Sequence, residues 1–264
     1  DWGFKGYVMS DWGATHSTIP AALAGLDQQS GYPFDKSPYF DGALKEAVQN
    51  GHVPEARLDD MAKRVLWAMA AHGVLDNPVK VQDSQIDYEA HGKISQLDAE
   101  EGIVLLKNQN NVLPLAAGLQ RIAVIGGHAN KGVLSGGGSA QVYPRGGMAV
   151  PNEGPEAWPG PMVYLPGSPM KALAARSKAK FTWHDGKDAA AAAKVAANAD
   201  VVLVFATQWT SEAADVPTLS LPNNQDALIA AVAEANPRTV VVLQTGTPVT
   251  MPWVNEVAGV VEAL

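Results

Sequence analysis

The sequence lacks cysteine altogether, which excludes disulfide bonds and thiolate metal sites. No apolar run approaches the ~20 residues of a membrane-spanning helix, so we expect no membrane partner. Positive charge is scarce, because 19 Lys and Arg oppose 27 Asp and Glu for a formal net charge of -8. Phosphate binding needs clustered basic residues, and those present are scattered, which argues against a nucleic-acid partner. The expected partner is an uncharged molecule.

Several cofactor and catalytic motifs are missing as well. The string "SGGGSAQ", residues 135–141, has no Lys-Ser/Thr after it, and "VIGGHANKG" lacks the spacing of a dinucleotide fingerprint. No Gly-x-Ser-x-Gly elbow surrounds Ser135, Ser139 or Ser168. The six histidines show no metal-ligand spacing such as HExxH. We therefore expect no cofactor and no metal.

What the chain does have is a regular alternation of helical and strand patterns in residues 94–264. Strands are expected in "RIAVIGG", "KFTWHDG", "VVLVFAT" and "TVVVLQTG", and helices in "SQLDAEEGIVLLKN", "PMKALAARSKA", "DAAAAAKVAANAD" and "NNQDALIAAVAEANP". This alternation predicts an α/β sandwich domain with a mostly parallel sheet. The Gly- and Pro-rich stretch 126–169 is longer than usual connections, so it is either functional or a surface flap.

The first part of the chain follows a different pattern. Residues 7–9 read as a strand, and "DGALKEAVQNG" and "VPEARLDDMAKRVLWAMAAHG" read as amphipathic helices. Because one strand cannot cover two such helices, residues 1–75 are predicted to be the end of a (β/α)8-type barrel. Residues 76–93 are polar, contain Pro78 and read as a linker, so 94–264 form the second domain, incomplete at its C-terminus.

Two carboxylates follow predicted strands. Asp11 ends "YVMS", and Glu212 lies in "QWTSEAAD" after "VVLVFA". Trp12 and Trp209 stand beside them, and aromatic rings offer an apolar face to sugars. Reactive groups of parallel α/β folds gather at the carboxyl ends of strands, so the pattern favours a carbohydrate site. The alternatives are that Asp11 caps the next helix, that Glu212 is a solvated loop acid, and that the tryptophans are packing residues.

Six segments in chain order carry a more specific signal. They are "GFKGYVMSDWGA" with "AALAGLD", "EGIVLLKNQNNVLPL", "IAVIGGHA", "SGGGSAQVYP", "QWTSEAADVPTLSLPNNQDALI" and "NPRTVVVLQTGTPVTMPW". Together they span nearly the whole chain, and they resemble glycoside hydrolase family 3, the β-glucosidase-like enzymes. The family often has Glu-Gly-x-Asp where this chain has "EAAD", and "LDQQSG" also departs from its pattern.

The resemblance implies site residues and a reaction. It implies that Asp11 is the nucleophile and Glu212 the general acid/base, with Trp12 beside the reacting sugar; Trp209 as a sugar platform is inferred from the residue type alone. The implied function is a retaining, exo-acting β-glycosidase that releases non-reducing terminal β-D-glucose from β-linked oligosaccharides or glucosides. The alternatives are a β-xylosidase of the family and a non-catalytic carbohydrate-binding protein. A relative acting on N-acetylglucosaminides is disfavoured, since those often lack the second domain.

A retaining mechanism sets two expectations for the carboxylates. They should stand about 5 Å apart across the cleft between the domains, and the pKa of Glu212 should be raised by burial or by the charge of Asp11. The resemblance implies that the family's sugar-binding Asp, Arg and Lys-His pair come from strands upstream of the nucleophile, which residues 1–264 do not include. We therefore expect this chain alone to be inactive and to need the remaining portion of the same enzyme as partner. The compartment stays open, with a periplasmic or secreted location favoured over the cytoplasm.

Overall fold

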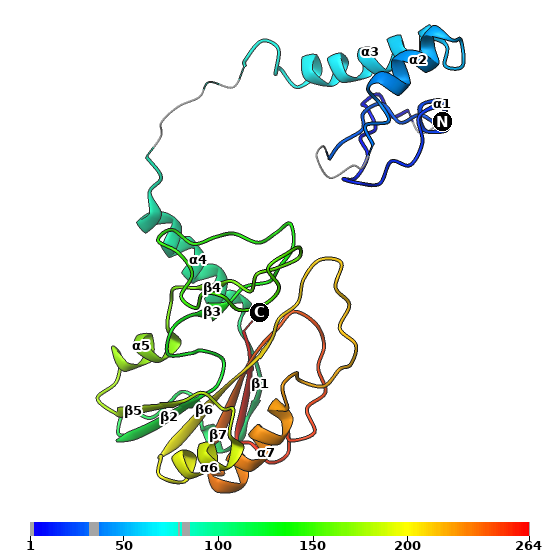
Figure 1. The fold of residues 1–264 in the computed structure, drawn as a ribbon. Helices are drawn as coiled ribbons and strands as arrows, with labels where there is room; N and C mark the ends of the chain where they lie inside the picture. The colour runs from blue at the N-terminus through cyan, green and yellow to red at the C-terminus, as the bar shows by residue number, and fades with distance from the viewer. Residues whose placement is uncertain (1–2, 32–36, 79, 81–84, 264) are drawn as a thin grey trace. The chain divides into compact units, whose positions relative to one another are not determined.

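The computed structural model describes residues 3–31, 37–78, 80 and 85–263. The chain divides into two compact units, Asp1–Ile86 and Asp87–Leu264 (Figure 1).

The described residues of the first unit form the helices α1 (Ile19–Ala24), α2 (Gly42–Gln49) and α3 (Glu55–Ala71). The two amphipathic helices predicted here are confirmed as α2 and α3. Their apolar stripes meet in a small core of Ala22, Leu44, Ala47, Val53 and Met61. Other apolar side chains of α3 stay exposed, namely Leu58, Leu66 and Trp67.

The strand predicted at residues 7–9 is wrong for this unit. Met9 forms only an isolated parallel bridge with Gln28, and the side chains of Val8 and Met9 are 46% and 51% exposed. A strand needs a neighbour along its length, and within the described part of this unit residues 8–10 pair only with the segment that follows α1. The segment is extended but does not belong to a sheet.

The second unit is organised around a six-stranded sheet with the order β1-β8-β7-β6-β2-β5. All neighbours run parallel except β1 and β8, which are antiparallel. The predicted α/β class with a mostly parallel sheet is therefore confirmed. The strands are β1 (Val104–Asn108), β2 (Arg121–Ile125), β5 (Lys180–His184), β6 (Val201–Gln208), β7 (Thr239–Thr245) and β8 (Gly259–Glu262).

Helices cover both faces of this sheet (Figure 1). On one face, α6 (Ala189–Ala197) and α7 (Gln225–Ala235) pack over one set of alternating side chains of the central strands. On the other face, α5 (Pro169–Ala174) packs over the opposite set. A central parallel strand is buried on both faces, so both sets of side chains are apolar. This explains the run of six apolar residues at the start of "VVLVFAT".

Three predicted boundaries in this unit differ from the structure. The segment "SQLDAEEGIVLLKN" was expected to be one helix, but α4 (Tyr88–Gly102) ends before Ile103, and "VLLKN" forms β1. Pairing with β8 overrides helix propensity in residues 104–108. The β-branched Val104 also favours a strand. Helix α4 also begins at Tyr88, capped by Asp87, so 88–93 of the expected linker are helical. Helix α5 ends at Ala174, short of the expected 179.

The long stretch 126–169 is mostly irregular. It contains a two-stranded antiparallel sheet of β3 (Val133–Leu134) and β4 (Tyr164–Leu165). Earlier in the chain, a short 3-10 helix, η1 (Gln109–Asn111), follows β1. It starts at the carboxyl end of β2 and includes the glycine-rich loop, residues 135–141. The loop therefore begins at the edge of the sheet where parallel folds place their functional groups.

Candidate active site

The backbone that leads to Asp11 is fixed by residues 27–30. The N–H groups of Asp27 and Gln28 both donate to the carbonyl of Val8, at 2.9 and 3.1 Å. In return, the N–H of Ser10 donates to the carbonyl of Gln28 at 3.0 Å, and its hydroxyl accepts from the N–H of Ser30 at 2.9 Å. This pairing sets the point at which the chain turns into Asp11.

Asp11 opens a tight turn and presents an exposed carboxylate. The N–H of Ala14 donates to the Asp11 carbonyl at 3.3 Å, and Gly13 adopts a φ of 76° inside the turn. The N–H of Trp12 donates to Oδ1 of Asp11 at 2.7 Å. The alternative that Asp11 caps the next helix is wrong, because α1 begins at Ile19 with Thr18 at its N-cap position.

Trp12 stands beside this carboxylate with 62% of its surface exposed. Its backbone lies against Gly31, where a Cβ would come within 2.7 Å of the Trp12 Cα. Gly31 also has a φ of 106°, which side-chain-bearing residues rarely adopt. The glycine thus supports the backbone of an exposed aromatic residue next to the carboxylate.

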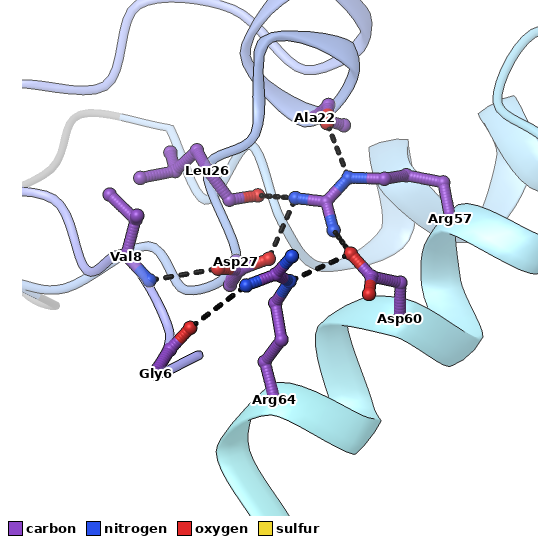
Figure 2. A network of polar contacts seen from close by, with 8 residues as sticks. All are labelled: Gly6, Val8, Ala22, Leu26, Asp27, Arg57, Asp60 and Arg64. Atoms are coloured by element: carbon purple, nitrogen blue, oxygen red, sulfur yellow. Dashed lines mark hydrogen bonds and ion pairs between the residues drawn. The ribbon is translucent and has the colours of Figure 1, made fainter. Parts of the chain in front are cut away.

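A buried ion pair anchors this region to α3 (Figure 2). Arg57 donates from Nη2 to Oδ1 of Asp27 at 2.7 Å, and the side chains are 14% and 2% exposed. The other oxygen of Asp27 accepts the N–H of Val8 at 2.8 Å. Arg57 also donates to the carbonyls of Ala22 and Leu26, so a single guanidinium links α3 to α1 and, through Asp27, to the segment before Asp11.

A second arginine extends the same network. Arg64 donates to the carbonyl of Gly6 at 3.1 Å and to Oδ2 of Asp60 at 2.9 Å, and Asp60 also accepts from Arg57 (Figure 2). The hydrogen bond from Arg64 lowers the pKa of Asp60. Sequence reasoning missed these residues, although the spacing of Arg57, Asp60 and Arg64 places them on one face of a helix.

The loop after β6 carries Glu212 at an exposed position. The N–H of Gly137 donates to the carbonyl of Thr210 at 2.9 Å, and Gly137 forms a parallel bridge with Ser211. The chain then turns sharply, with Ala213 in the left-handed region at a φ of 59°. The glycine-rich loop and the Glu212 loop are therefore paired along their backbones.

Ser139 of the glycine-rich loop binds the Glu212 carboxylate twice. Its N–H donates to Oε2 at 2.8 Å, and its hydroxyl donates to the same oxygen at 2.5 Å. The expected raised pKa of Glu212 is wrong for this unit, because these hydrogen bonds, the hydroxyl first, lower the pKa and outweigh the effect of desolvation. The motif "SGGGSAQ" alone indicated no role for Ser139, because its contact with Glu212 joins residues that are far apart in the sequence.

The surroundings of Glu212 and Trp209 differ. Glu212 lines a cavity of about 380 Å³ together with Asp215, Thr210 and Thr247. Trp209 instead lines a cavity of about 620 Å³ at the carboxyl ends of β2, β5 and β6. Its indole lies against Gly137, and its buried Nε1 has no hydrogen-bond partner within the described residues. The Trp209 side chain therefore packs against the glycine-rich loop at Gly137.

Asp11 belongs to the first unit and Glu212 to the second, and each is held by contacts inside its own unit. Within the described ranges, no group of three or more His, Asp or Glu side chains is arranged to hold a metal ion. Over the same ranges, every helix is too short or too polar to cross a membrane.

Comparison with known proteins places the chain in a family. The sequence profile described as "Glycosyl hydrolase family 3 C-terminal domain" matches residues 103–264. Thermostable beta-glucosidase B of Acetivibrio thermocellus is 34% identical over 100% of this chain and 33% of its own length. An exo-alpha-(1->6)-L-arabinopyranosidase of Bifidobacterium breve is 32% identical over 100% of this chain and 34% of its own length.

Solved structures give the same result. The GH3 beta-glucosidase of Bifidobacterium adolescentis superposes with a TM-score of 0.74 at 31% identity, over 100% of this chain and 36% of that one. A beta-glucosidase of Streptomyces venezuelae in complex with D-glucose superposes with a TM-score of 0.80 at 26% identity, over 99% of this chain and 47% of that one. The chain spans about a third of the length of the curated relatives it matches. It belongs to glycosyl hydrolase family 3, and residues 103–264 represent the C-terminal domain of that family.

Proposed function

We propose that the complete protein that carries this chain is a retaining, exo-acting β-glycosidase that releases β-D-glucose from the non-reducing end of β-linked oligosaccharides or glucosides. The relatives named as beta-glucosidases support the substrate class. The observation that carries the proposal is the exposed Glu212 carboxylate, which the glycine-rich loop fixes at the tip of the loop after β6. The rest of the same enzyme is the expected partner of this chain.

In this proposal the two carboxylates have complementary roles. Asp11 attacks the anomeric carbon while Glu212 gives a proton to the departing oxygen, and Glu212 then takes a proton from the water that releases the sugar. The lowered pKa keeps Glu212 ionised, which suits the second step because a base must be deprotonated to take up a proton. The first step needs a protonated Glu212, so we expect bound substrate to raise its pKa by excluding water and bringing it near the charge of Asp11.

Trp12 is the proposed sugar platform. It is an exposed aromatic residue next to the proposed nucleophile, and an apolar ring face can stack on the C–H groups of a pyranose. Trp209 is proposed to act indirectly, as the support of the glycine-rich loop, since it lines a different cavity from Glu212.

A second candidate substrate is an α-L-arabinopyranoside, because two relatives that match 100% of this chain are named exo-alpha-(1->6)-L-arabinopyranosidases. Aryl β-glucoside, β-xyloside and α-L-arabinopyranoside substrates separate these candidates. Proton NMR of the first-formed sugar anomer tests retention. No hydrolysis of any of them by the complete protein would instead favour a non-catalytic carbohydrate-binding protein.

Removing the nucleophile is the direct test of Asp11. In the complete protein, Asp11→Ala should lower kcat/KM on an aryl β-glucoside by about 10³-fold or more, because the covalent path is lost. Asp59→Ala, which removes an exposed carboxylate of α3, is the matched control and should keep wild-type activity. An Asp11→Ala enzyme with wild-type rates would refute the assignment.

Removing the acid/base should give a different signature. Glu212→Ala should slow turnover by about 10²-fold or more, and added azide should restore turnover of a substrate with a good leaving group, since azide needs no general base. The product should be the β-glycosyl azide. Glu234→Ala on α7 is the control. Absence of azide rescue would point to another acid/base residue.

A further inference from the structure

The structure points to Ser139 as the residue that positions Glu212: we propose that Ser139 holds Oε2 and thereby leaves Oε1 as the oxygen that exchanges the proton with the glycosidic oxygen and with water. This inference rests on the proposed function, since it assigns a division of labour within the proposed acid/base. Ser139 itself touches no reacting atom and is a positioning residue.

The contacts of the carboxylate are one-sided. Both the N–H and the hydroxyl of Ser139 end on Oε2, at 2.8 and 2.5 Å. Among the residues that the structure describes, both hydrogen bonds to the Glu212 carboxylate end on Oε2 and none ends on Oε1. Two bonds to one oxygen fix the rotation of the carboxylate, so its second oxygen is left for the substrate.

The loop that carries Ser139 is itself held in place. Gln141 donates from its backbone N–H to the carbonyl of Gly138 at 3.1 Å and from Nε2 to the carbonyl of Pro161 at 2.8 Å. The N–H of Gly137 donates to the carbonyl of Thr210, and Gly137 forms a parallel bridge with Ser211, the residue before Glu212. Although Ser139 is exposed, these contacts hold its loop in place beside the carboxylate.

The glycines make this approach possible. A Cβ at Gly138 would overlap the Cβ of Glu212, and the φ of 84° at Gly138 also favours glycine. A Cβ at Gly137 would come within 2.7 Å of Ser211 Oγ and of Trp209 Cζ2. The sequence "GGG" before Ser139 therefore allows backbone to lie directly against the proposed acid/base.

A hydroxyl suits both protonation states of the carboxyl group. It donates to Oε2 of the carboxylate, and it can keep donating when the proton is on Oε1, because Oε2 is then the carbonyl oxygen of the carboxylic acid and still accepts. In the first step the proton on Oε1 passes to the glycosidic oxygen as its bond to the anomeric carbon breaks. In the second step Oε1 takes a proton from water as the water oxygen displaces Asp11. Ser139 keeps its own proton throughout.

The hydrogen bonds from Ser139 dominate the pKa of Glu212. Asp215 is the other charged residue that lines the Glu212 cavity within the described chain, but the causes of the pKa shift are the two Ser139 hydrogen bonds, which lower it, and desolvation, which raises it. In the proposed site, the negative charge of Asp11 would raise the pKa of Glu212, opposite to Ser139. Loss of the Ser139 hydroxyl removes a donor to the charged form, so the pKa of Glu212 should rise in Ser139→Ala.

The test uses the complete protein and two β-glucosides. With a poor leaving group such as phenol, Ser139→Ala should lower kcat/KM by about 10-fold, a fraction of the full effect of general acid catalysis. With dinitrophenol, which leaves without a proton, kcat/KM should stay within about 2-fold of wild type. The basic limb of the kcat/KM profile should move up by about 0.5 pH unit or more.

Matched variants separate positioning from structure. Ser139→Thr keeps the hydroxyl at an exposed position and should restore both the leaving-group dependence and the pH profile of wild type. Ser135→Ala removes a hydroxyl of the same loop that donates to Gly136, and should leave both unchanged. Circular dichroism melts check that each variant folds. If Ser139→Ala does not fold, Ser139→Cys, a weak donor of similar size, should show the same changes in smaller amount.

The outcomes distinguish the two proposals. If azide rescues Glu212→Ala but Ser139→Ala keeps the wild-type leaving-group dependence and pH profile, the positioning role is overturned and the proposed function stands. If azide does not rescue Glu212→Ala, the role of Glu212 fails, and the role of Ser139 fails with it.

Discussion

The turn that carries Glu212 passes through a residue whose backbone suits glycine. Ala213 has a φ of 59°, and an L-residue with a Cβ pays for this left-handed conformation. We expect Ala213→Gly to raise the stability of the chain by about 0.5–1 kcal/mol, because the strain relieved exceeds the entropy that glycine adds to the unfolded state. Urea unfolding followed by circular dichroism measures this.

The adjacent alanine provides the control for that prediction. Ala214 does not share the positive φ, so Ala214→Gly should lower stability by up to about 1 kcal/mol. Equal destabilisation by the two substitutions would show that position 213 is not strained. The positive φ also gives a physical reason for the glycine that the family often has after this glutamate, at the position where this chain has alanine.

At the level of elements, α3 is tied to the segment before Asp11 by a buried charge. Removing Arg57 would leave the carboxylate of Asp27, 2% exposed, without its partner, and such losses cost about 3–5 kcal/mol. We therefore expect Arg57→Ala to destabilise the first unit by about this amount. Hydrogen exchange measured by mass spectrometry should show faster exchange in peptides that cover residues 6–12.

Variants on the same helix make this prediction specific. Lys63→Ala removes an exposed charge of α3 and should change stability by less than about 0.5 kcal/mol. Arg57→Lys keeps the charge but cannot reach the carbonyls of Ala22 and Leu26 together with Asp27, so its effect should be intermediate. Unchanged exchange in Arg57→Ala would mean that the ion pair does not hold this segment.

A pH-sensitive link joins the starts of β2 and β6. Asp200 accepts from the N–H groups of Gln120 and Arg121, at 2.7 and 2.8 Å, and these bonds lower its pKa below 3.8. A lowered folded-state pKa gives stability that is complete above the unfolded-state value and is lost as pH falls through the folded-state value.

The melting temperature tests this link. Asp200→Asn should melt below wild type at pH 6, and the difference should shrink as the pH falls from the ordinary pKa of an aspartate towards the lowered pKa of folded Asp200, because the unfolded chain takes up the proton first. Melts followed by circular dichroism between pH 3 and 7 give the comparison. A difference that is constant over this range would show that the charge of Asp200 contributes nothing.

Elements with a complete local signal were predictable from the sequence. Strands β2, β6 and β7 are continuous apolar runs, and α7 has a clear apolar stripe, so period and composition decide them. Strand β1 was mistaken for helix because its pairing with β8 is non-local. Asp11 and Glu212 were singled out by their places after apolar runs, whereas Ser139 was missed, since its contact with Glu212 crosses 73 positions of sequence.

At the scale of the whole chain, the hydrophobic cores separate cleanly. One core cluster involves only residues of the first unit, and the two larger clusters involve only residues of the second. A unit with its own core is expected to fold by itself. We therefore predict that residues 87–264, expressed alone, unfold in one cooperative thermal transition with a near-ultraviolet signal from packed tryptophans.

Trp253, 1% exposed, is the natural reporter for that experiment, because it packs in the larger core and donates to Asp226 at 2.7 Å. Trp253→Phe should reduce the near-ultraviolet signal and keep the fold, with Trp183 and Trp209 supplying the remainder. A broad, non-cooperative melt of residues 87–264 would show that the core needs the first unit.

The link between two distant loops has a practical consequence for engineering. The Glu212 carboxylate lies in one loop, and the Ser139 hydroxyl that lowers its pKa lies in another. Changes in the glycine-rich loop can therefore shift the pKa of Glu212. A library confined to residues 139–141 would be expected to spread the pH optimum among its members while leaving sugar preference as it was. Natural relatives could adapt to acidic or neutral habitats by the same route, without touching a group that meets the substrate.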